Sequence, residues 1–247
     1  MAHFIFSAFC DESGETTIGG QMAACKANGI THMELRGFGD RSINDFTVEE
    51  AIAMKKKIDD QGMKVASIGS GYGKIEITDD FEPHFEKFKN TVAVGKALDA
   101  KYIRIFSFFF TNGESHEAYR DEVIRRVKAM EDYAVEQVII PCLENEKDVY
   151  GDTAERMNEV LRACDNLLGV FDPSNFVQCG VDTLKAYELI GDKIEYFHVK
   201  DALFETGTVV PSGEGDGNVL ALLKMFAQKD GVKVLSLEPH LKVFDGL

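Results

Sequence analysis

The chain has 247 residues, of which 45% are apolar and 28% charged, a balance typical of a globular protein with a sizeable core. No apolar run approaches the roughly 18 residues of a membrane span, and a net charge of −15 repels nucleic acid and anionic membranes, so we expect neither partner. The five cysteines are scattered without a CxxC pair, and the N-terminal residues lack the basic start of a signal peptide. Both observations predict a cytoplasmic protein with reduced thiols.

Short apolar segments alternate with longer amphipathic ones along the whole chain. The short segments are rich in β-branched and aromatic residues and are predicted strands. They cover residues 3–9, 31–36, 63–70, 101–107, 137–144, 167–172, 194–200 and 232–238. The amphipathic segments are predicted helices, at 17–28, 47–61, 80–99, 115–135, 153–164, 181–190 and 217–229. Thr47 with Glu50 three positions later is a capping-box signature for one helix start.

Regular alternation of strands and helices implies parallel strands joined by right-handed crossovers. Eight such units favour a closed (β/α)₈ barrel, or TIM barrel, over an open sheet, and we expect a single domain over residues 1–247. Only nine residues follow the eighth strand, so the last outer helix is missing. We expect either that the chain continues past Leu247 with this helix or that another subunit of a homo-oligomer covers the groove. A barrel that tolerates an open seam is the remaining alternative.

Four potential metal ligands end consecutive predicted strands: Glu144, Asp172, His198 and Glu238. Catalytic groups of (β/α)₈ barrels lie at these C-terminal strand ends. Three carboxylates in one place are costly unless a cation neutralises them, so the set predicts one divalent metal ion. Oxygen ligands with one imidazole favour Mn²⁺, with Mg²⁺, Co²⁺ or Zn²⁺ as alternatives. Taken singly, each glutamate is more often a loop or salt-bridge residue, and His198 more often a structural histidine.

Several short motifs occur in a fixed order: ELRG at 34–37, GYGK at 71–74, LEN at 143–145, FDPSNF at 171–176, FHVKD at 197–201, PSGEGDG at 211–217 and LEPH at 237–240. Together they resemble the xylose isomerase-like TIM barrels of the sugar isomerase/epimerase superfamily over nearly the whole chain. The resemblance implies that the four ligands above bind one divalent metal ion. In similar ketose epimerases the strand-five and strand-eight glutamates face opposite sides of the substrate, which implies that Glu144 and Glu238 are the catalytic acid/base pair. The family often has histidine after "EN", where this chain has Glu146.

The predicted substrate-binding residues are Glu34, Arg36, Lys74, Lys200 and His240. Glu34 and Arg36 have the alternative of a local ion pair, and Lys74 that of a solvated lysine. The loop that carries Lys74 lacks the spacing and the final Ser/Thr of a phosphate-binding Walker A motif, which disfavours nucleotide binding. The glycines of 210–217 either make a turn or let backbone N–H groups approach substrate, and we favour the turn.

These features predict a metal-dependent isomerase or epimerase of a sugar, sugar acid or sugar phosphate. Such an enzyme transfers a proton next to a carbonyl through an enediolate, which a bound cation stabilises. The alternative is a dehydratase or lyase that acts on a keto-sugar or inosose. A non-catalytic sugar-binding module with a structural metal is less favoured because of the paired glutamates. A nuclease-like hydrolase is disfavoured by the negative charge and by only six histidines.

Overall fold

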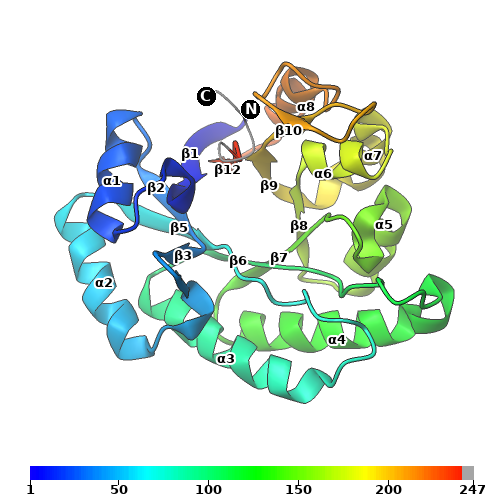
Figure 1. Ribbon diagram of the computed structural model, residues 1–247, viewed down its shortest axis with the longest axis horizontal. Helices are drawn as coiled ribbons and strands as arrows, with labels where there is room; N and C mark the ends of the chain where they lie inside the picture. Colours follow the sequence, from blue (N-terminus) through cyan, green and yellow to red (C-terminus); the bar gives the residue numbers. More distant parts are fainter. Residues whose placement is uncertain (241–247) are drawn as a thin grey trace.

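The computed structural model describes residues 1–240, and its centre is a closed barrel of eight parallel strands (Figure 1). Around the barrel the strands follow the order β1-β12-β9-β8-β7-β6-β5-β2. Their bounds are β1 His3–Phe9, β2 His32–Leu35, β5 Lys64–Ile68, β6 Tyr102–Ile105, β7 Ile140–Glu144, β8 Leu168–Phe171, β9 Ile194–Val199 and β12 Val232–Leu237. The predicted (β/α)₈ barrel is confirmed, and each predicted strand contains one barrel strand.

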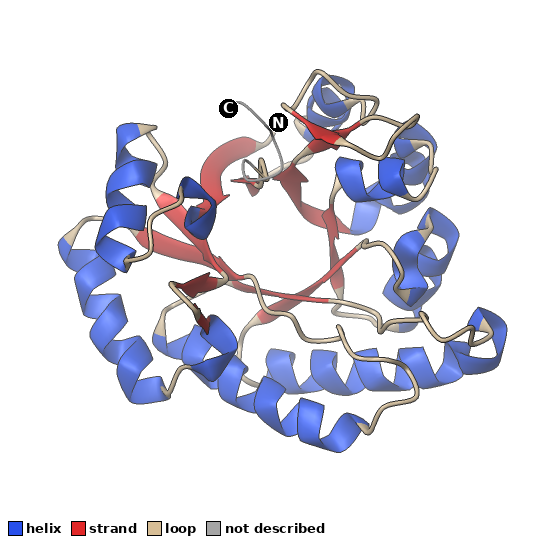
Figure 2. Cartoon of the chain, in the orientation of Figure 1, coloured by secondary structure: helices blue, strands red, loops and turns tan. Residues whose placement is uncertain are grey.

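Helices surround most of the barrel and cover the outer face of most of its strands (Figure 2). They are α1 Ile18–Ala27, α2 Val48–Asp60, α3 Phe81–Ala97, α4 His116–Glu136, α5 Ala154–Ala163, α7 Thr183–Ile190 and α8 Val219–Phe226, one in each predicted helical segment. The capping box at the start of α2 is present, because the Thr47 side chain accepts from the Glu50 N–H and Glu50 accepts from the Thr47 N–H. Among residues 1–240, no helix combines the length and apolar character needed to cross a membrane.

Smaller elements lie between the barrel strands and the outer helices, most of them at the C-terminal ends of the strands, and were not predicted. The short helix α6 (Pro173–Gln178) follows β8 directly. Two hairpins, β3 (Gly37–Phe38) with β4 (Arg41–Ser42) and β10 (Asp201–Ala202) with β11 (Val209–Val210), extend the loops after β2 and β9. Four single 3₁₀ turns are η1 Cys10–Ser13, η2 Ile43–Asp45, η3 Tyr150–Asp152 and η4 Gly191–Lys193.

The barrel interior is filled by its own small apolar cluster, separate from the larger core between strands and helices. Tyr102 and Tyr196 lie in this cluster with ring centroids 5.4 Å apart, together with Cys142 and Val170. Burial raises the pKa of the Cys142 thiol well above its ordinary value, which fits an inert, inward-facing cysteine. The cluster closes the barrel below the polar strand ends, so a site there opens on one side only.

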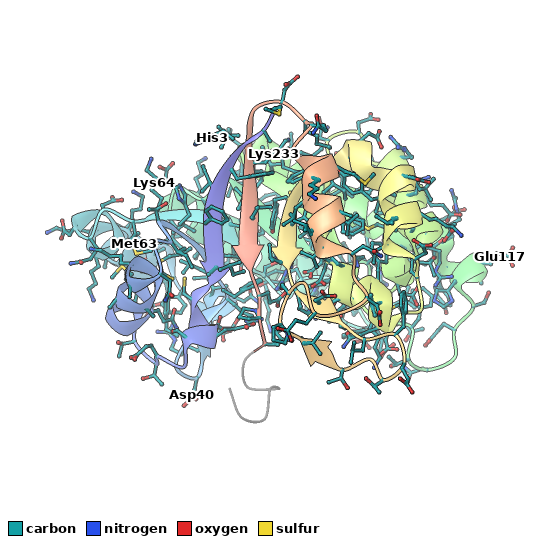
Figure 3. All side chains as sticks on the ribbon, turned by 90° about the horizontal axis from the view of Figure 1, so that it is seen from above. His3, Asp40, Met63, Lys64, Glu117 and Lys233 are labelled. Carbon is teal, nitrogen blue, oxygen red and sulfur yellow. The ribbon has the colours of Figure 1, made fainter. Side chains whose placement is uncertain are left out.

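The outer face of β1 and β12 carries no covering helix within the described residues (Figure 3). Phe6 on β1 is 52% exposed and Val232 on β12 is 48% exposed, although both belong to barrel strands. Within residues 1–240, an uncovered outer face on these two strands is what the sequence analysis expects. Residues 241–247, from which the predicted continuation of the chain would start, lie outside the described residues.

Candidate active site

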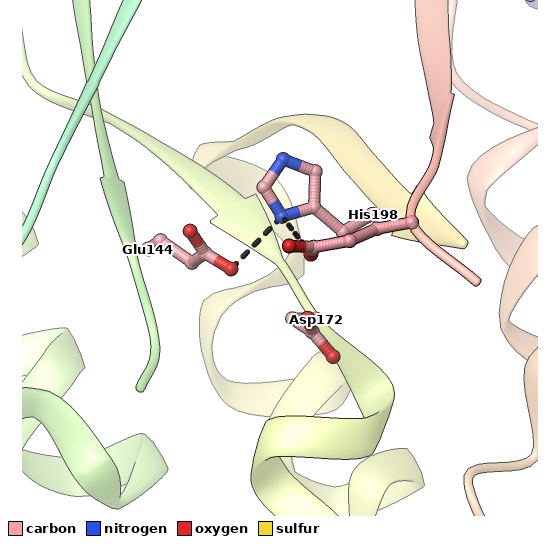
Figure 4. Close-up of side chains that lie close together, drawn as sticks. Glu144, Asp172 and His198 are labelled. Atoms are coloured by element: carbon pink, nitrogen blue, oxygen red, sulfur yellow. Dashed lines mark hydrogen bonds and ion pairs between the residues drawn. The ribbon is translucent and has the colours of Figure 1, made fainter. Parts of the chain in front are cut away.

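The ends of four neighbouring strands bring Glu144, Asp172, His198 and Glu238 together. One ligand atom from each of these buried side chains lies within 4.8 Å of the others. His198 Nδ1 is 2.8 Å from Glu144 Oε1 and 3.3 Å from Glu238 Oε2. Figure 4 shows Glu144 of β7 facing the imidazole of His198 of β9, with Asp172, the residue after β8, close to both. The parallel barrel order β12-β9-β8-β7 is the reason that residues far apart in sequence meet here.

Each of the three carboxylates also forms an ion pair with a basic side chain. Arg104 Nη1 lies 3.0 Å from Glu144 Oε2, Lys200 Nζ lies 3.0 Å from Asp172 Oδ2, and Arg36 Nη1 lies 3.2 Å from Glu238 Oε1. These partners come from β6, the end of β9 and the end of β2. They offset much of the cost of burying three like charges in one place.

Two asparagines fix the strand ends that carry the ligands. Asn145 accepts from the backbone N–H of Asp172 at 2.9 Å and donates to its carbonyl at 2.8 Å, which locks β7 against β8. Asn175 donates to the Asn145 carbonyl at 3.0 Å and accepts from Lys200 at 2.9 Å. Asp172 is the N-cap of α6 and accepts from the Asn175 N–H at 3.0 Å. The "LEN" and "FDPSNF" motifs thus form one hydrogen-bonded unit.

A pocket of about 330 Å³ opens over the cluster. Four of the predicted substrate-binding residues line it: Arg36, Lys74, Lys200 and His240. Glu34, the fifth, does not line this pocket. It lies fully buried in the barrel interior, where it accepts from the Tyr196 hydroxyl at 2.9 Å, and it forms no ion pair with Arg36.

Sequence reasoning did not predict other residues of the pocket wall, which include Arg104, Glu146, Asn175 and Gln178. The inward direction of Arg104 was predictable, because alternation along β6 places Tyr102 and Arg104 on the same face of the strand. Glu146 lies in the loop after β7, and Asn175 and Gln178 lie on the short helix α6, which the sequence analysis did not predict.

Lys74 is held at the edge of the pocket by a constrained loop. Gly73 adopts φ +92°, and a Cβ there would collide with the Phe106 carbonyl. The Gly73 N–H donates to His84 Nε2 at 2.8 Å. Lys74 Nζ then lies 2.7 Å from Glu146 Oε2 and 4.3 Å from the centroid of the Phe106 ring. Lys74 is therefore a paired side chain rather than a free, solvated lysine.

The glycine-rich loop after β11 folds around one buried carboxylate. Asp201 accepts from the N–H groups of Gly213, Gly215 and Gly217 at 2.9, 3.1 and 2.8 Å. A Cβ at Gly217 would lie 2.6 Å from Asp201 Oδ1, so the close approach requires glycine. These N–H groups are used inside the protein, which supports the turn interpretation over contact with substrate.

The sequence profile of the xylose isomerase-like TIM barrel family matches residues 22–242, most of the chain. The chain belongs to this family. Among curated proteins, none matches it.

Solved structures with the same fold include proteins whose names describe different reactions. The probable 3-DHS dehydratase AsbF from Bacillus anthracis has 18% identity and a TM-score of 0.77, with 96% of this chain and 92% of that chain covered. A D-tagatose 3-epimerase-like protein has 16% identity and a TM-score of 0.76, covering 97% and 92%. The IolI protein, solved with a bound zinc atom, has 16% identity and a TM-score of 0.73, covering 96% and 88%. At these identities the likeness shows the fold alone.

The charged groups of this xylose isomerase-like barrel shift one another's protonation. Burial opposes ionisation of Glu144, but the charges of His198 and Arg104 outweigh it and hold its pKa below the ordinary value. For Glu238, burial is likewise outweighed by Lys200 and His198, so its pKa lies well below the ordinary value. Burial raises the pKa of Asp172 to about 6, although Lys200 opposes the shift. Burial opposes protonation of His198, but Glu144 and Glu34 raise its pKa well above the ordinary value.

The donor set of this xylose isomerase-like site fits a divalent cation. Three carboxylates and one imidazole nitrogen face a common point, and such ligands suit Mg²⁺, Mn²⁺ or Zn²⁺. Glu238 Oε2 is buried and has no hydrogen-bond partner within residues 1–240, and a cation would satisfy it. A second group of possible ligands, Glu12 with Glu238 and His240, fits less well, because the Arg36 guanidinium already contacts both carboxylates at 3.1 and 3.2 Å.

Proposed function

We propose that this protein is a metal-dependent isomerase or epimerase of a sugar, a sugar acid or a sugar phosphate. The observation that carries the proposal is the pair Glu144 and Glu238, two buried carboxylates on β7 and at the end of β12. The strands β8 and β9 separate them in the barrel, so they approach the cluster from its two flanks. A cation-binding group with a carboxylate on each side suits removal of a proton at one face of a substrate carbon and its return at another.

The residues of the site have different roles in this reaction. A divalent cation bound by Glu144, Asp172, His198 and Glu238 would polarise the substrate carbonyl as a Lewis acid. Glu144 and Glu238 exchange the proton of the carbon next to that carbonyl. Return of the proton on the opposite face inverts the carbon, and return to the adjacent carbon interconverts aldose and ketose. Arg104 holds Glu144 ionised and in place, and Arg36 and Lys200 do the same for Glu238; all three basic side chains line the pocket.

A second candidate function is dehydration of a keto-sugar or inosose by the same proton abstraction. One observation favours it. The ammonium of Lys200 is buried between Asp172, at 3.0 Å, and Glu238, at 3.7 Å, and lines the pocket, where its positive charge would stabilise the oxygen of a departing hydroxyl. A probable dehydratase is among the structures with this fold.

The proposal includes Mn²⁺ as the favoured cation, with Mg²⁺, Co²⁺ or Zn²⁺ as alternatives. It also includes a small-molecule sugar as the partner, rather than nucleic acid or membrane, and a cytoplasmic location. The net charge of −15 supports the choice of partner.

The test is a panel of ketoses, aldoses, sugar acids, their phosphates and cyclitol ketones, incubated with protein and Mn²⁺ in D₂O and followed by NMR. We expect deuterium to enter at the carbon next to the carbonyl, with appearance of an isomer or epimer, and activity to disappear with chelator. Loss of water from the substrate would instead establish the dehydratase. Absence of both changes across the panel would contradict the proposal.

Two variants then test the acid/base pair. Glu144→Gln and Glu238→Gln should each lower turnover by at least about 10²-fold, the usual size for a general acid or base. Glu195→Gln is the matched control, because Glu195 lies on β9 near its opposite end and bonds to Tyr102 and Lys233 instead. Metal content is measured for each variant, since a lost ligand also lowers activity. Near wild-type turnover in either variant would remove that residue from the mechanism.

A further inference from the structure

A layer of buried polar side chains lies inside the barrel and includes His198, one of the candidate metal ligands. It contains Ser7 of β1, Glu34 of β2, Ser236 of β12 and His198 of β9, each at most 1% exposed. The strand register explains their proximity, because Ser7 pairs with Ser236 and Ser236 pairs with His198. Such groups are costly to bury unless each finds a partner, so the contacts within the layer are informative.

Glu34 divides its two carboxylate oxygens between different neighbours. Oε1 accepts from the Tyr196 hydroxyl at 2.9 Å, and that hydroxyl also shares a hydrogen bond with Ser67 at 3.1 Å. Oε2 lies 3.3 Å from Nε2 of His198. Within residues 1–240 neither Oε2 nor Nε2 has a hydrogen-bond partner of good geometry, so this contact joins two buried polar atoms that both lack one.

The two nitrogens of the His198 imidazole therefore face different environments. Nδ1 faces Glu144 and Glu238, where the cation would bind, and Nε2 faces Glu34. The rings of Phe9 and Tyr196 contact the imidazole edge-on, with centroids 5.1 and 5.5 Å away, and restrict its rotation. A nitrogen that binds a metal carries no proton, so the ring proton must lie on Nε2.

We infer that Glu34 is a positioning residue for the metal site, which accepts the Nε2–H of His198 and thereby presents Nδ1 to the cation. This places Glu34 outside the substrate pocket, in contrast to the substrate-binding role predicted from the sequence. A carboxylate behind a ligating histidine fixes the tautomer and ring orientation and strengthens the nitrogen as a ligand. The inference rests on the metal-binding part of the proposed function and is independent of the reaction.

The test measures Zn²⁺ binding by calorimetry for the wild type, Glu34→Gln and Glu131→Gln. Glu131 is the matched control, because it is fully buried on α4 and also has one oxygen without a partner, but it does not contact His198. We expect Glu34→Gln to weaken Zn²⁺ binding by about 10- to 100-fold and Glu131→Gln to change it by less than about twofold. Thermal unfolding of the metal-free proteins checks that all three are folded.

A second measurement needs no variant. In Zn²⁺-loaded protein labelled with ¹⁵N-histidine, the His198 imidazole should show a protonated Nε2 and a metal-bound Nδ1. The reverse tautomer, or equal Zn²⁺ affinity in the wild type and a folded Glu34→Gln protein, would overturn the inference while leaving the metal site intact. A wild-type protein that binds no divalent metal would overturn the proposed function and this inference together.

Discussion

Replacement of Arg104 by methionine tests how far the site depends on its internal cations. Arg104 is 5% exposed, and its guanidinium donates to Glu144 Oε2 at 3.0 Å, to the Ser70 carbonyl at 3.2 Å and to the Gly69 carbonyl at 3.1 Å. At an effective dielectric constant of 20 the attraction to Glu144 is worth about 5–6 kcal/mol, part of which is spent on desolvation of the arginine. Removal of one partner from a buried ion pair costs about 3–5 kcal/mol, and we expect a loss of that size in Arg104→Met.

Urea unfolding in the presence of chelator measures this loss, with Arg126→Met as the control. Arg126 is also buried, but on α4, and it pairs at 2.6 Å with the partly exposed Glu122. The control should lose only about 1–2 kcal/mol. Saturating divalent metal should reduce the stability difference between Arg104→Met and the wild type, because the cation restores positive charge beside Glu144. The stability difference between Arg126→Met and the wild type should not change. An Arg104→Met protein within about 1 kcal/mol of the wild type would refute the reasoning.

Two further predictions concern pH. Burial opposes protonation of His198, but Glu144 raises its pKa, so the metal-free ring is protonated near neutral pH. Metal binding should therefore release about one proton and weaken as pH falls. Calorimetry in two buffers of different ionisation enthalpy measures the released proton, and equal observed heats in the two buffers would contradict the prediction. Burial lowers the pKa of His84 to about 4 from its ordinary value of 6.5. The folded protein thus binds fewer protons than the unfolded chain, so the contribution of His84 is complete above pH 6.5 and is lost as pH falls toward 4. Because His84 is partly exposed, we expect it to lower the free energy of unfolding by only about 1–2 kcal/mol between pH 7 and pH 5. Urea unfolding of His84→Gln should show a decrease that is smaller by this amount over the same pH range.

The barrel was predictable because its signals are local and repeated eight times. Each strand is a short apolar run bounded by polar turns, and each outer helix has an apolar stripe at helical spacing. The helix α6 was not predicted, although the sequence marks its start. Asp172 ends the predicted sixth strand and also caps α6, with Pro173 in the first helical turn. An Asp-Pro pair after a strand is a helix-start signal, so the sequence does contain a signal for α6.

Side-chain direction was harder to predict than position along the chain. The cluster Glu144, Asp172, His198 and Glu238 was predictable because neighbouring parallel strands end at the same face of the barrel. Glu34 lies near the end of β2, yet it points into the interior. The pairing of β2 with β5 shifts register between Met33 and Glu34, and such an irregularity re-aims the side chain that follows it. No apolar alternation over the four residues of β2 reveals such a shift.

The arrangement of cations explains how an acidic site can form before any metal binds. Glu144, Asp172 and Glu238 are matched by Arg104, Lys200 and Arg36, each from a different direction. The two arginines contact oxygens on the outer sides of Glu144 and Glu238, so they can remain in place when a cation binds between those residues. Lys200 differs, because its Nζ contacts both Asp172 and Glu238 and competes for the oxygens that a cation needs. Metal binding must therefore loosen Lys200 from at least one carboxylate, and the pocket that Lys200 already lines is the space open to its ammonium group.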